Sequence, residues 1–167
     1  MKAHKILAVS LLLPFLLTGC GKKTEEKAME KQIEQATGGK ADVDLSKDRM
    51  SITTKTDKGE VKMQVGENVA LPDNFPKDVF VYPGSKISTA MQTPEGFHVD
   101  MVSGDKKQDV IDAYQKTMQS NGWSVQTTMA MGPQNMMVYD KGDRTANIII
   151  SADDDNSVHI TLSVGNK

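Results

Sequence analysis

The stretch KISTAMQTPEGFHVDMVSGDKKQDVIDAYQKTMQSNGW, residues 86–123, decides the fold of this chain. Apolar and polar side chains alternate on both sides of Thr93-Pro94-Glu95, a pattern that predicts a β-hairpin over residues 86–103. The residues that follow carry apolar side chains at helical spacing, namely Val110, Ile111, Tyr114 and Met118. Gly122 suits the left-handed position that ends a helix. The stretch therefore predicts two antiparallel strands and then a helix.

Four further strand candidates lie downstream of this helix. They are WSVQTTMAM (123–131), NMMVYDK (135–141), RTANIIIS (144–151) and SVHITLSV (157–164). All the connections are as short as those of hairpins, except the one that contains the helix. Residues 85–167 are therefore expected to form a ββαββββ antiparallel sheet with one helix packed on a face, an α+β domain.

The N-terminal part predicts a smaller unit over residues 20–66. A helix is expected from Thr24 to about Ala36, and the strands that follow include RMSITTKT and EVKMQVG, which alternate around Asp57-Lys58-Gly59. We expect this helix to pack on a small antiparallel hairpin or meander. Residues 67–84 contain three prolines and are expected to form a packed connector between the two units.

The first residues, MKAHKILAVSLLLPFLLTGC, have the pattern of a secretory signal peptide over residues 1–19, with a basic start and an apolar run. The run is too short for a permanent membrane-spanning helix, which needs about 20 apolar residues. The run ends in Leu17-Thr18-Gly19-Cys20, which resembles the lipobox of bacterial lipoproteins. This resemblance implies cleavage before Cys20 and covalent acylation of its thiol, so that the lipid anchors the protein to a membrane.

The mature chain also resembles small bacterial envelope lipoproteins of uncharacterised function. The residues that carry the resemblance are FPKDVFVYPGSKI (75–87), the following strand pair, and the helix that ends in NGW (121–123). The resemblance implies a location and an architecture, and no reaction. In a Gram-negative host, Gly21 after the cysteine implies the periplasmic face of the outer membrane; otherwise the protein is expected on the outer face of the cell membrane.

The charge balance and the motifs of the sequence limit the classes of function that we expect. The chain has 20 basic and 22 acidic side chains, and removal of the signal peptide takes away two lysines, so nothing favours nucleic-acid binding. No nucleophile elbow or other catalytic motif is present. We therefore expect a non-enzymatic binding module without a cofactor other than the lipid on Cys20. Its partner would be another envelope protein, peptidoglycan or a small ligand.

Two strand patterns place histidines on the polar side of the sheet. His98 and Asp100 alternate with apolar residues in GFHVDMVS, and His159 does so in SVHITLSV. If these two strands pair, the three side chains would converge as metal ligands or as the acid–base site of a hydrolase. The alternative is two solvated histidines, and strand order decides between them.

Methionines are concentrated in MAMGPQNMM, residues 129–137. A four-residue loop over 132–135 would bring Met129, Met131 and Met136 to one face of a hairpin. Thioethers bind soft ions such as Cu(I) and Ag(I), but methionine also fills irregular gaps in cores.

We expect this methionine face to pack beneath the helix that carries Tyr114 and Met118. An exposed adhesive surface and a soft-metal site are the alternatives.

Overall fold

The computed structural model describes residues 21–153 and 157–167. Residues 1–20, which include the expected signal peptide and lipid site, lie outside this part. The described elements are α1 (Lys22–Thr37), β1 (Lys40–Leu45), β2 (Arg49–Thr56), β3 (Gly59–Gly66), β4 (Lys86–Thr93), β5 (Gly96–Ser103), α2 (Lys107–Ser120), β6 (Ser124–Met131), β7 (Gln134–Lys141), β8 (Arg144–Ala152) and β9 (Val158–Asn166).

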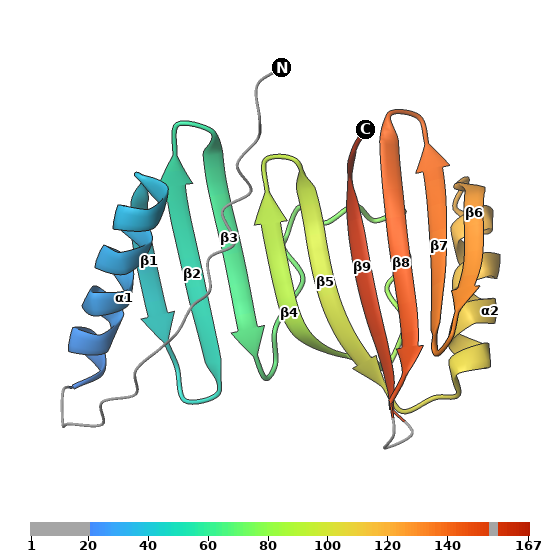
Figure 1. Cartoon of the computed structure of the whole chain (residues 1–167), viewed down its shortest axis with the longest axis horizontal. Coiled ribbons are helices and arrows are strands. Elements are labelled where there is room, and N and C mark those ends of the chain that lie inside the picture. Colours follow the sequence, from blue (N-terminus) through green and yellow to red (C-terminus); the bar gives the residue numbers. More distant parts are fainter. Residues whose placement is uncertain (1–20, 154–156) are drawn as a thin grey trace.

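All nine strands form a single antiparallel sheet in the order β1-β2-β3-β4-β5-β9-β8-β7-β6 (Figure 1). The expected fold class, a small meander beside a separate ββαββββ sheet, is therefore wrong. The two parts are joined because β3 pairs with β4, from Lys62 opposite Gln92 to Val65 opposite Thr89. The connector, residues 67–84, separates these two strands in the chain, so no short turn joins them. The sequence therefore carries no local signal for their pairing.

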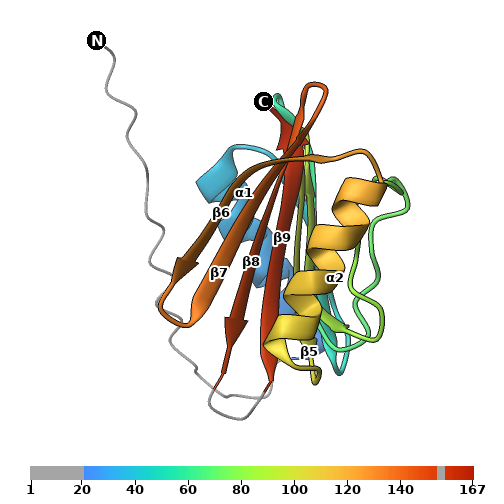
Figure 2. The same cartoon turned by 90° about the vertical axis from the view of Figure 1, so that its right-hand side faces the viewer.

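One face of the sheet is covered by α2 and by the connector (Figure 2). The helix ends as its sequence predicts: Gly122 adopts φ 83°, and the Trp123 amide donates to the carbonyl of Met118 at 3.0 Å. Phe75 of the connector packs edge-on against Phe97 of β5, with ring centroids 5.4 Å apart. The hydrophobic core therefore lies on this side of the sheet, and we call the opposite side the open face.

Alternation along the strands assigns each side chain to a face. On β5 the odd-numbered side chains enter the core, as shown by the burial of Val99 and Met101. On β9 the even-numbered ones do, as shown by the burial of their neighbours Ile160 and Leu162. The polar residues between them point to the open face.

Helix α1 lies along the outer side of β1, at the edge of the sheet (Figure 1). Three glutamates, four residues apart, accept hydrogen bonds from the free amides of β1. These are Glu26 to Leu45 (2.9 Å), Glu30 to Val43 (3.2 Å) and Glu34 to Ala41 (3.1 Å). The spacing fits because four helical residues rise about 6 Å and two strand residues about 7 Å.

Candidate functional site

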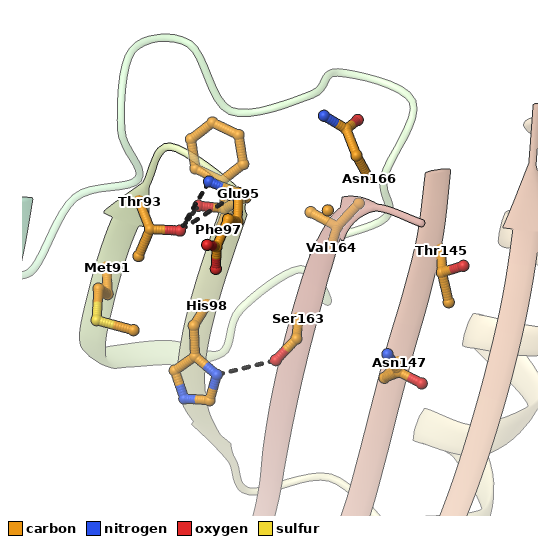
Figure 3. A pocket seen from close by; sticks show the side chains of 12 residues that line it. Met91, Thr93, Glu95, Phe97, His98, Thr145, Asn147, Ser163, Val164 and Asn166 are labelled. Atoms are coloured by element: carbon orange, nitrogen blue, oxygen red, sulfur yellow. Dashed lines mark hydrogen bonds between the residues drawn. The ribbon is translucent and has the colours of Figure 1, made fainter. Parts of the chain in front are cut away.

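A hollow on the open face lies over the paired strands β5 and β9 (Figure 3). It has a volume of about 270 Å³. Side chains and backbone of β4, β5, β8, β9 and the β4–β5 turn line it: Met91, Thr93, Glu95, Gly96, Phe97, His98, Thr145, Asn147, Ser163, Val164, Gly165 and Asn166. We call it the open-face hollow. Its lining is rich in hydroxyl and amide groups.

The hollow exists because two glycines face each other at its floor. Gly96 is paired with Gly165 across β5 and β9. A Cβ atom on Gly96 would collide with the carbonyl oxygen of Val164, and one on Gly165 would lie 2.5 Å from the carbonyl oxygen of Glu95. The two strands therefore approach too closely for side chains there, and the flanking residues form walls around an empty floor.

A chain of hydrogen bonds starts at Ser163 and His98 in the wall of the hollow and continues along the open face. The Ser163 hydroxyl lies 2.9 Å from Nδ1 of His98, and Nε2 of His98 lies 3.1 Å from Oδ2 of Asp100. The Thr161 hydroxyl donates to Oδ1 of Asp100 at 2.8 Å. The imidazole is thus held on both nitrogens, and its orientation is fixed before any ligand arrives.

Pairing of β5 with β9 brings together only part of the predicted His98, Asp100 and His159 group. His98 and Asp100 are in contact, but His159 stands opposite Val102, further along the strands. The Nε2 atom of His159 lies 2.9 Å from Oδ2 of Asp153 instead. Among the residues that the structure describes, no cluster of three or more His, Cys, Asp or Glu side chains is arranged to hold a metal.

Sequence reasoning missed Ser163 and Thr161, although both alternate with apolar residues on the same strand as His159. The polar face of β9 was recognised. Its register against β5, which brings Ser163 opposite His98, was not available from the sequence.

The order hydroxyl, imidazole, carboxylate is also that of a hydrolase triad. However, β9 is a central strand between β5 and β8, so its backbone amides serve the two ladders. An oxyanion formed at Ser163 would need donors from side chains. The two side chains in register with Ser163 are His98 of β5, which is already bonded to it, and Asn147 of β8. The arrangement presents hydrogen-bonding groups of Ser163, His98 and Asn147 to the hollow.

A second hollow, of about 420 Å³, lies between the connector and strands β3 and β4. It is lined by Lys62, Gln64, Ala70, Leu71, Pro72, Asp73, Asn74, Ala90 and Gln92. It opens on the other side of the sheet from the open-face hollow, because Gln64 is paired with the buried Ala90. We call it the connector hollow.

Met129, Met131 and Met136 of the β6–β7 hairpin lie on the open face, away from the hollow. Met129 stands directly opposite Met136, and Met137 is the one that enters the core. Met129 and Met131 remain 41% and 50% exposed. The expectation that Met129, Met131 and Met136 pack beneath the helix is therefore wrong, because α2 covers the other face, where Met137 and Tyr139 are fully buried.

The lipid site Cys20 lies outside the described residues, and lipidation stays a prediction. No helix in the described part of the chain is both long enough and apolar enough to cross a membrane.

Residues 85–157 match the model of a family described as START domain-like. The match begins at the first residue of the expected C-terminal unit and ends before β9, so it spans β4 to β8 with α2. No curated protein and no solved structure matches the chain. The similarity is compatible with a ligand-binding module.

Proposed function

We propose that this chain is a non-enzymatic binding protein of the cell envelope that holds a small, uncharged, polar ligand in the open-face hollow. The observation that carries the proposal is the glycine floor of the hollow, surrounded by prearranged hydrogen-bonding groups. Small-ligand sites usually measure about 300–1,000 Å³. At about 270 Å³, the hollow suits one compact unit of a larger molecule or a single small molecule.

The lining indicates the chemistry of the ligand. Ser163, Thr145 and Asn147 present hydroxyl and amide groups, while Glu95 adds a carboxylate at the rim. Groups of this kind pair with hydroxyls and amides that both donate and accept. Of the expected partners, a sugar unit that carries an amide, as in peptidoglycan, fits this pattern better than an apolar ligand.

The proposal is tested by titrating the full chain with soluble N-acetylated sugar fragments of peptidoglycan and following amide chemical shifts. Shifts are expected at His98, Asn147 and Ser163. Asn147→Ala should weaken binding about tenfold, which corresponds to the loss of one hydrogen bond of about 1.4 kcal/mol. Shifts confined to the connector hollow would refute the site, and an absence of shifts would refute the ligand class.

Asn74→Ala is the matched control for this variant. Asn74 carries the same amide and lies in the connector hollow, on the other side of the sheet. It should leave the affinity unchanged. An equal loss of affinity in both variants would mean that the effect is not local to the open-face hollow.

Membrane attachment through Cys20 is part of the same proposal and has a separate test. Metabolic labelling with a fatty acid should mark the wild-type chain, and Cys20→Ser should be unlabelled and released from membranes. A Cys20→Ser chain that stays bound and labelled would refute the anchor.

Soft-metal binding is a second candidate function, and the pairing of Met129 with Met136 favours it, since Met131 is exposed on the same face. Three thioethers within reach of one another suit Cu(I) or Ag(I). A competition titration of the full chain with a Cu(I) chelator at micromolar concentration tests this. Competition that disappears in Met136→Leu would support the site, and no competition by the wild-type chain would exclude it.

A further inference from the structure

The two edges of the nine-stranded sheet differ in whether their outward backbone groups have hydrogen-bond partners. At one edge, the outward amides of β1 are occupied by the glutamates of α1. At the other edge lies β6, and no hydrogen bond joins a backbone group of this strand to any described residue beyond β7. All but one of its residues are exposed. The sheet therefore has one closed edge and one open edge.

The open edge lacks the features that usually prevent strand pairing. Exposed edge strands are commonly protected by charged residues or proline. The sequence of β6, SVQTTMAM, contains neither. In the described part of the chain, the large hydrophobic residues with marked exposure are Val125, Met129 and Met131, and all three belong to β6.

The hairpin geometry tells which backbone groups of β6 point outward. Gly132 and Pro133 form a two-residue turn, and the positive φ of Gly132, 58°, at its first position is typical of type II′. The flanking pair, Met131 and Gln134, is then hydrogen-bonded, and so is Met129 with Met136. The amide and carbonyl of Thr128 therefore face away from β7.

We propose that β6 pairs antiparallel with β6 of a second copy of this chain, about a two-fold axis at Thr128. This pairing would continue the sheet from one copy into the other. It satisfies the outward backbone groups of both strands at once, because Thr128 of each copy exchanges two hydrogen bonds with its counterpart.

An identical chain suits this edge for two reasons. A strand without charge meets no like-charge repulsion when it pairs with itself, and an isologous contact closes after two copies. In this register Met129 of one copy lies diagonal to Met129 of the other on the same face, within reach of long side chains. The exposed methionines of each copy are thus partly covered by those of the other.

Disulfide trapping in the full chain tests the proposal. In the paired strands, the Cα atoms of the two Thr128 residues would be about 5.5 Å apart, which falls within the range that a disulfide spans. Thr128→Cys, expressed in the bacterial envelope with a mild thiol oxidant, should give a covalent dimer on a non-reducing gel. The wild-type chain is the control for cross-linking through Cys20. Asp143→Cys, at the exposed β7–β8 turn, is the control for disulfides that form by random collision.

A dimer band for Thr128→Cys no stronger than that for Asp143→Cys would overturn the proposal. So would trapping of a different protein in place of a second copy, since the strand would then have another occupant.

A second variant tests the contact without a cross-link. Thr128→Lys places two ammonium groups beside each other at the axis, whereas Gln119→Lys adds the same charge on an exposed site of α2. Sedimentation of the detergent-solubilised full chains should show dimers for wild type and Gln119→Lys and monomers for Thr128→Lys. Equal dimer fractions in all three chains would refute the β6 contact, whatever the outcome of the sugar titration.

Discussion

At the scale of single residues, Asp78 holds together segments that are distant in the sequence. Its carboxylate accepts two hydrogen bonds from Arg144, at 3.1 and 2.6 Å, and one from Lys141 at 2.7 Å. Its backbone carbonyl accepts from the Trp123 indole at 2.8 Å and from Nδ2 of the Asn121 side chain at 3.2 Å. Asp78 of the connector therefore links the end of α2 to the β7–β8 hairpin through hydrogen bonds.

These contacts give a physical reason for two motifs that the sequence displays, FPKDVFVYPG and NGW. The first contains Asp78 and the second contains Asn121 and Trp123, and the structure joins them by hydrogen bonds. The helix end was predictable, because Gly122 and its neighbours specify it locally. The partner of the indole was not, because it lies 45 residues away.

Asp78→Asn should lower the free energy of unfolding by about 2 kcal/mol at pH 7, the scale of hydrogen bonds between charged groups. The guanidinium of Arg144 and the ammonium of Lys141 hold the pKa of Asp78 well below its usual range. A carboxyl whose pKa is lower in the folded state stabilises the fold above its unfolded pKa, about 3.9, and loses this effect as the pH falls. Urea unfolding at pH 7, 4 and 2.5 measures the difference.

The gap between wild type and Asp78→Asn should therefore shrink as the pH falls below about 4. A gap of constant size at all three pH values would show that the charge of Asp78 contributes nothing. Asp143→Asn, at an exposed turn in the same hairpin, is the control and should change stability little.

At the scale of elements, the β6–β7 hairpin shows how far the pairing register of two strands can be predicted from a sequence. A four-residue loop was expected over residues 132–135, and the structure has a two-residue turn at Gly132 and Pro133. The register is thereby shifted by two positions from Thr127 to Met131, which leaves these side chains on their expected faces. A bulge between Val125 and Thr127 then places Val125 opposite Tyr139, on the other face. The sequence thus groups Met129 with Met136 correctly.

The sequence cannot tell which of the two faces the helix covers. Both faces of β7 carry apolar residues, with Met136 and Val138 on one and Met137 and Tyr139 on the other. The methionine-rich face was expected to enter the core, but the face with Tyr139 does so.

The contact between α1 and β1 is also an element-scale feature, and it predicts a local effect. Glu30→Ala removes the acceptor of the Val43 amide, so the unfolding free energy should fall by about 1 kcal/mol. Amide exchange at Val43 should accelerate. Gln32→Ala, an exposed residue of the same helix, should leave this amide unaffected. Unchanged exchange at Val43 in Glu30→Ala would mean that the carboxylate does not protect the edge.

At the scale of the whole molecule, the sheet depends on two non-local pairings, β3 with β4 and β5 with β9. Neither is connected by a hairpin turn. The sequence predicted most strands from alternation and turn residues, because these signals are local. It could not predict that β9 inserts beside β5, and therefore could not predict the hydrogen bond between His98 and Ser163 that forms one wall of the open-face hollow.

The core is unevenly distributed along this sheet. The main buried cluster draws its residues from Val79 to Val164, and none comes from α1, β1, β2 or β3. Regions with few buried apolar contacts open at lower free energy than the core. We therefore expect β1 and β2 to open before the rest of the sheet, so that residues 21–66 behave as a separate cooperative unit despite the continuous hydrogen bonding.

Native-state hydrogen exchange at increasing urea concentration tests this expectation. Met137→Ala should lower the global free energy of unfolding by about 2–4 kcal/mol, since the side chain is fully buried in the core. The protection of core amides such as Ile148 and Leu162 should fall by that amount. The protection of Ile52 in β2 should not change, because its exchange occurs through an opening that leaves the core intact. An equal fall at all three amides would show that the nine strands unfold as one unit.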